Sequence, residues 1–174
     1  ANAQRGRYVH NYGAFYLGED LAWGAYPISN DVQGGYYRIG YQYARWSWNA
    51  GLDAIDSISG KGFDGLYASS FARSQASSSL GYGGSFNLRH GAGHTGYSAQ
   101  AFVDRQGDWG QTRWQLDRAQ GNGNDSWQVG VDQALPLREG SRLSASLSYG
   151  SLDYGFGASR TIVAALYGGR DLGD

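Results

Sequence analysis

The chain has 174 residues and a formal net charge of −1, with 14 basic and 15 acidic side chains and no cysteine. The missing cysteines exclude disulfides and thiol chemistry, and the lack of a basic run disfavours nucleic acid as a partner. No stretch of about 18 apolar residues occurs, so no transmembrane helix is predicted. The 29 glycines and the aromatic share of 15% favour strands over helices. We therefore predict an all-β chain.

Alternation of apolar and small polar residues predicts about ten or eleven strands, and segment 141–150 shows this pattern best. Short connectors rich in glycine, serine and aspartate separate the strands, which predicts an antiparallel up-and-down meander. The segments 35–43 and 45–55 form either one long strand or a tight pair. In chain order, the predicted strands cover residues 6–17, 20–28, 35–43, 45–55, 65–73, 78–89, 96–105, 111–118, 126–135, 142–152 and 159–168.

Each predicted strand has one apolar side and one polar side, which leaves open what each side contacts. In a soluble β-sandwich the polar side would face bulk water. Two features favour a membrane β-barrel instead. The chain has one lysine and two glutamates, although soluble surfaces use these residues freely. The strands have roughly ten residues, which is the length that crosses a bilayer at about 45° of tilt.

Three segments resemble bacterial outer-membrane β-barrels: SRLSASLSYGSLDYG (141–155), DSWQVGVDQAL (125–135) and GYSAQAFVDRQGDWG (96–110). The resemblance extends over nearly the whole chain, as a pattern and not as a signature motif. It implies a transmembrane β-barrel in the outer membrane of a Gram-negative bacterium, with a polar, mixed-charge lumen and no cofactor. The implied function is a passive pore or part of an export channel. Its partners would be the lipid bilayer and a transported solute or an exported polymer or protein.

The short connectors are similar to those in the barrels of exporters, such as fimbrial ushers or exopolysaccharide-secretion porins. Residues 1–174 are expected to form a single β-barrel domain that is incomplete at its C-terminus. Outer-membrane barrels commonly end in a strand with a terminal aromatic residue, whereas this chain ends ALYGGRDLGD. Residues 169–173 are predicted to form a hairpin turn. Missing strands or further subunits would complete the barrel.

Charged residues on the polar side are the candidate functional residues, because lumen charges determine which solutes pass through a barrel. A ladder of structural ion pairs is the alternative role for the same side chains. The mixed signs argue against strong selectivity for anions or cations. The predicted lumen-lining residues are Arg38, Arg45, Asp53, Arg89, Asp104, Arg113, Asp117, Asp132 and Arg142.

Neither a metal site nor a catalytic site is predicted. His90 and His94 flank a Gly-rich turn, where their spacing does not guarantee that the two rings meet, and no third ligand is evident. His10 stands apart from both, and the chain has no nucleophile elbow. We expect a protein that is not an enzyme.

A secreted, soluble β-sandwich or barrel that binds carbohydrate is the alternative function. Under that interpretation Trp46, Trp48, Trp114 and Trp127 would be exposed and would stack on sugar rings. Their position on the same side as leucine and valine favours contact with an apolar surface instead.

Overall fold

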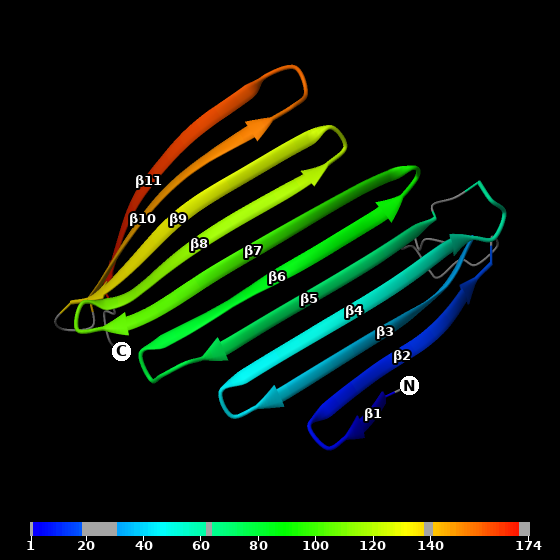
Figure 1. Cartoon of the computed structure of the whole chain (residues 1–174), viewed down its shortest axis with the longest axis horizontal. Helices are drawn as coiled ribbons and strands as arrows, with labels where there is room; N and C mark the ends of the chain where they lie inside the picture. Colours follow the sequence, from blue (N-terminus) through cyan, green and yellow to red (C-terminus); the bar gives the residue numbers. More distant parts are fainter. Residues whose placement is uncertain (1, 19–30, 62–63, 138–140, 171–174) are drawn as a thin grey trace.

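The computed structural model describes residues 2–18, 31–61, 64–137 and 141–170, which form a single antiparallel sheet of eleven strands (Figure 1). The strands follow one another in chain order across the sheet, so the predicted all-β, up-and-down meander is confirmed. Their bounds are β1 Asn2–Arg5, β2 Tyr8–Leu17, β3 Val32–Tyr43, β4 Trp46–Ser57, β5 Gly65–Gln75, β6 Leu80–Gly91, β7 His94–Gly107, β8 Gly110–Gly121, β9 Asn124–Pro136, β10 Ser141–Asp153 and β11 Ala158–Arg170.

Several predicted boundaries change. Segments 35–43 and 45–55 are two strands, with Tyr43 opposite Trp46 across a tight turn. The strand predicted over 6–17 is confirmed as β2 from Tyr8 onward, whereas the preceding strand β1 was not predicted; the chain reverses between the two at Gly6, which has a φ of 63°. The turn predicted over 169–173 is wrong at its start, since β11 continues to Arg170. The strand predicted over 20–28 lies outside the described residues.

Two hairpin turns show why the sequence reverses where it does. Ala92 and Gly93 have φ values of 50° and 76°, and Asn122 and Gly123 have values of 52° and 78°. Positive φ at both central residues is the mark of a type I′ turn, whose twist matches that of the strands it joins. Glycine adopts this backbone conformation without strain and asparagine tolerates it.

The two faces of the sheet differ in chemistry. Paired residues of an antiparallel sheet lie on the same face, and successive residues alternate between faces. One row across the sheet therefore defines the apolar face: Tyr8, Tyr41, Trp48, Ala72, Gly84, Ala101, Leu116, Val129, Tyr149 and Ile162. The next row defines the polar face: Val9, Gly40, Asn49, Phe71, Ser85, Gln100, Asp117, Gln128, Gly150 and Thr161.

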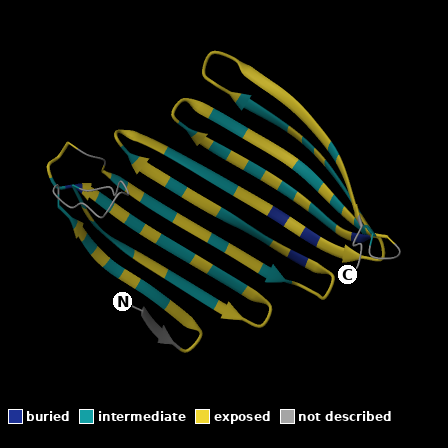
Figure 2. Ribbon diagram, turned by 180° about the vertical axis from the view of Figure 1, so that it is seen from behind, coloured by how far each residue is buried: buried dark blue, intermediate teal, exposed yellow. Residues whose placement is uncertain are grey.

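The sheet is a single layer without a conventional core. Among the described residues, Phe102 is the one buried hydrophobic side chain, and Ser57 and Asp104 are the buried polar ones (Figure 2). Many large apolar side chains are exposed, among them Ile162 and Leu166, at 71% and 69%. The described part of the chain contains no helix that could cross a bilayer.

The strands are staggered in a regular way, and the lower turns in Figure 1 form a staircase. A row at right angles to the strands runs from Tyr43 on β3, beside the β3–β4 turn, to Val103 on β7, four strands further on. Val103 lies four residues before Gly107, which pairs with Gly110 at the β7–β8 turn. Each step from one strand to the next therefore shifts the turns by one residue along the strand direction. With about 3.4 Å per residue and 4.8 Å between strands, this shift corresponds to a strand tilt of about 35°.

Candidate functional site: the polar face

The polar face collects most of the predicted lumen residues. Arg38, Asp53, Arg89, Asp104, Arg113, Asp117, Asp132 and Arg142 all lie on it, as the register of the strands places them. Arg45 does not, because it forms the β3–β4 turn, where its carbonyl oxygen accepts a hydrogen bond from the Gln75 N–H at 2.6 Å. The alternation therefore located the face correctly, and the one exception comes from the turn.

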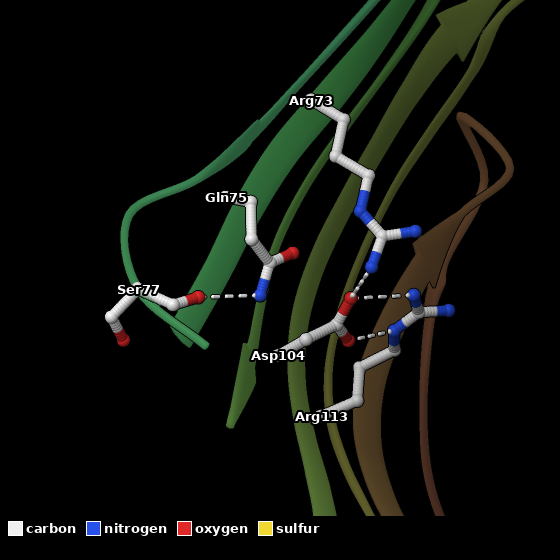
Figure 3. Close-up of polar contacts among 5 residues, drawn as sticks. All are labelled: Arg73, Gln75, Ser77, Asp104 and Arg113. Carbon is white, nitrogen blue, oxygen red and sulfur yellow. Dashed lines mark hydrogen bonds and ion pairs between the residues drawn. The ribbon is translucent and has the colours of Figure 1, made fainter. Parts of the chain in front are cut away.

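A three-residue ionic cluster occupies the lower part of this face (Figure 3). Asp104 on β7 accepts hydrogen bonds from Arg113 Nε at 2.6 Å and from Arg113 Nη2 at 3.0 Å. Arg73, two strands away on β5, donates to the same carboxylate at 3.3 Å. The Asp104 side chain is 7% exposed, whereas the two arginines are 42% and 46% exposed. A buried carboxylate with three charge-assisted bonds is firmly held, and the cluster links strands β5, β7 and β8.

An aromatic pair lies beside the ionic cluster on the same face. Phe71 and Phe102 stack with ring centroids 6.4 Å apart, and the Arg113 guanidinium lies 4.7 Å from the Phe102 centroid. Between their strands, Gly83 leaves the space that the Phe102 ring fills, because a Cβ there would come within 2.7 Å of its Cζ. Glycine at this position lets the ring lie flat over β6, which explains why Phe102 is buried.

Smaller polar contacts extend over the rest of the face. Arg38 donates to Asp53 at 3.1 Å, in a pair whose side chains are 59% and 34% exposed. Gln100 Nε2 donates to Asp117 at 2.7 Å. An exposed ion pair such as Arg38–Asp53 contributes little to stability. Their main effect is to place charge of both signs on one surface.

Sequence reasoning missed Arg73 and Phe102 as members of this face. Arg73 ended a predicted strand and received no role, although it lies in phase with Phe71 and Ser69. Phe102 sits between Ala101 and Val103 and so looks apolar in context. Phe102 lies two residues before Asp104, so strict alternation would have assigned both side chains to the polar side.

The histidines form no common site. His90 pairs with Thr95 on the apolar face, and its Nδ1 lies 2.6 Å from the Thr95 hydroxyl. His94 pairs with Gly91, which lies on the other face. His10 bonds instead to the Tyr37 hydroxyl at 2.8 Å. Within the described residues, no group of three or more histidine or carboxylate side chains is placed to hold a metal ion.

At the upper end, Asp31, which directly precedes β3, is hydrogen-bonded to residues at the end of β4 and just after it. Its carboxylate accepts hydrogen bonds from the Ser59 N–H at 2.8 Å, the Ser59 hydroxyl at 2.5 Å and the Ser57 hydroxyl at 3.1 Å. The hydrogen bond from the Ser59 hydroxyl is the main reason that the pKa of Asp31 lies below its ordinary value. Partial desolvation raises this pKa, whereas the bonds from the Ser59 N–H and the Ser57 hydroxyl and the charge of Lys61 lower it further. The carboxylate is therefore ionised and acts as a structural acceptor.

The tryptophans predicted to be apolar-facing lie on the apolar face. Trp48, Trp114 and Trp127 belong to the same face as Leu116 and Val129. Trp46 is on this face also, next to the β3–β4 turn. The aromatic side chains therefore accompany aliphatic ones and are not set apart as a separate platform.

No family model, curated protein or solved structure matches this chain.

Proposed function

We propose that this sheet is a wall of an outer-membrane β-barrel in a Gram-negative bacterium. The apolar face contacts lipid, and the polar face lines a water-filled lumen that serves as a passive pore or as part of an export channel. The observation that supports this most is the contrast between two open faces of a single-layer sheet. One face needs an apolar environment and the other needs water, and a barrel in a bilayer provides both.

The apolar face has polar limits at both ends. On β7, Thr95 and Arg105 enclose Tyr97, Ala99, Ala101 and Val103; on β10, Ser141 and Ser151 enclose a similar run. Arg105 lies ten positions after Thr95, which is about 34 Å along the strand and about 28 Å after tilting by 35°. Membrane barrels have an apolar band about 25 Å tall, so the apolar height supports the proposal.

Aromatic residues lie near both limits of this band. Trp48 and Tyr41 stack near the lower turns, with ring centroids 6.4 Å apart. Trp127 and Tyr149 meet edge to face toward the upper turns, with centroids 5.4 Å apart. Such aromatic girdles mark the two interfaces of a membrane barrel, where amphipathic rings contact headgroups.

The stagger and the edge of the sheet also support a barrel. A tilt of about 35° lies in the range of closed barrels, 35–45°. β11 has 13 residues without proline, and its outer edge is paired with no other described strand. A long unprotected edge promotes aggregation in solution, and barrel closure with further strands or subunits removes it.

The polar face suits a lumen better than an outer surface. Its charged side chains are arginine and aspartate, and several are paired with each other, as in Arg38–Asp53 and the Asp104 cluster. The remaining positions are mostly serine, glutamine and glycine. Charges of both signs on this face favour passage of polar solutes without strong ion selectivity.

A reconstitution experiment tests this function. The chain should aggregate in detergent-free buffer, fold in detergent micelles with a β-type circular dichroism spectrum, and insert in vesicles so that brominated lipids quench its tryptophan fluorescence. A monodisperse, folded protein without detergent would contradict the proposal and would favour the secreted, carbohydrate-binding alternative. Conductance steps in a planar bilayer would distinguish an open pore from a closed barrel.

A further inference from the structure

The polar face contains a hollow on strands β6 to β11 that the ionic clusters do not occupy. Its volume is about 490 Å³, its polar lining includes Ser85, Ser98, Gln100, Asp117, Gln128 and Ser148, and Ala119, Leu152 and Val163 add apolar surface. These side chains come from five neighbouring strands and share one face by register. We call this hollow the hydroxyl–amide trough.

The trough presents one charge. Arg118 also borders the hollow, but its guanidinium donates to the Tyr97 hydroxyl at 3.3 Å and to Asp125 at 2.7 Å. Tyr97 and Asp125 lie on the apolar face, opposite to the trough. Asp117 is thus the charged side chain that the trough displays, and it already accepts a hydrogen bond from Gln100 at 2.7 Å.

The chemistry of the lining selects a class of ligand. A serine hydroxyl and a glutamine amide each both donate and accept hydrogen bonds. The groups that match them are ligand hydroxyls, which also do both. An anionic ligand would meet no available cationic side chain in the trough. The arginines of the polar face lie outside it. The aromatic pair Phe71 and Phe102 lies outside the hollow.

We propose that the hydroxyl–amide trough binds uncharged, hydroxyl-rich chains, that is, neutral oligosaccharides. This inference rests on the proposed function, since the trough would lie in the lumen. Many small hydrogen-bonding groups without a stacking platform hold such a chain weakly. Weak, distributed binding allows a solute to enter and also to leave, as passage through a channel requires.

The test compares maltohexaose with a galacturonate hexamer, which has similar length and carries negative charge. In planar bilayers, maltohexaose should interrupt the current through the wild-type chain, and the galacturonate hexamer should not. Calorimetry in detergent micelles should give the same order of affinity. The double variant Gln100→Leu, Gln128→Leu should weaken maltohexaose binding about fivefold, since two hydrogen bonds are lost.

Gln42→Leu is the matched control, because Gln42 lies on the polar face, opposite Ser47 and outside the trough. It should bind maltohexaose like the wild type, and circular dichroism should confirm that all variants fold. Equal weakening by both variants, or equal binding of the two sugars, would overturn the inference. Conductance without any maltohexaose binding would overturn it and leave the pore intact. Binding in micelles without conductance would support the trough and contradict the pore.

Discussion

Gly83 and Phe102 lie opposite each other on strands β6 and β7, and the absence of a side chain at Gly83 lets the Phe102 ring pack over the sheet. A Cβ at Gly83 would lie 2.5 Å from the Ala72 carbonyl oxygen and 2.7 Å from Phe102 Cζ. The backbone oxygen cannot move aside without distorting β5. This pair therefore fixes the one buried hydrophobic side chain among the described residues of the sheet.

Substitution at Gly83 should destabilise the sheet. We expect Gly83→Ala to lower the free energy of unfolding by about 1–3 kcal/mol, because the new methyl group is forced into a packed site. Urea titration of the micelle-folded protein, followed by circular dichroism, measures the change. Gly40→Ala is the control, since a Cβ at Gly40 meets nothing within 4 Å. An equal loss at both positions would show that the close packing at Gly83 is not the cause.

Removal of the Asp104 charge should weaken the ionic cluster. In Asp104→Asn, the carboxylate that Arg73 and Arg113 share disappears, and two arginines remain close together. We expect a loss of about 1–2 kcal/mol, after allowing for the exposed arginine side chains. Asp53→Asn removes one exposed pair and should cost well under 1 kcal/mol. In a bilayer, Asp104→Asn should also shift ion selectivity toward anions; unchanged reversal potentials would contradict a lumen position.

The same charge should be costly on the apolar face and nearly neutral on the polar face. Leu116 and Gln115 are neighbours on β8 and lie on the apolar and polar faces respectively. Leu116→Arg should destabilise the vesicle-inserted protein by about 2–4 kcal/mol, as arginine does on the lipid face near the bilayer midplane. Gln115→Arg should change stability by less than about 1 kcal/mol. Equal effects of the two variants on unfolding in vesicles would argue against a lipid-facing apolar face.

The hydrogen bonds that the Asp31 carboxylate accepts should depend on pH. The folded-state pKa of Asp31 is lowered, so its contribution to stability is fully present above the unfolded carboxyl pKa and is lost as the pH falls through the folded pKa. The protection factor of the Ser59 amide, which donates to Asp31, is the intrinsic exchange rate at each pH divided by the observed rate, and it should therefore fall at acidic pH. Asp31→Asn should lower that protection factor at neutral pH and remove its dependence on pH. A pH profile identical to that of the wild type would contradict this role.

The sequence predicted the strands and their faces well, because side-chain period depends on strand geometry alone. Leu147 and Ser148, for example, are assigned to opposite faces by alternation and lie there in the sheet. Partner strands and register are set by long-range pairing, which one sequence does not reveal. The hydrogen bond from Arg73 to Asp104, 31 residues apart, could not be foreseen for this reason. The β1–β2 reversal was missed because its two-residue turn, Gly6–Arg7, contains one glycine and none of the other common turn residues.

The central claim is that one face meets lipid and the other meets water, and single spin labels on β7 test it most directly. The chain has no cysteine, so one cysteine at a time can be placed at each position from Tyr97 to Asp104 and labelled in vesicles. Labels at positions 97, 99, 101 and 103 should be more accessible to oxygen, and those at 98, 100, 102 and 104 to a water-soluble nickel complex. Equal access of the nickel complex to both sets of positions would contradict the account.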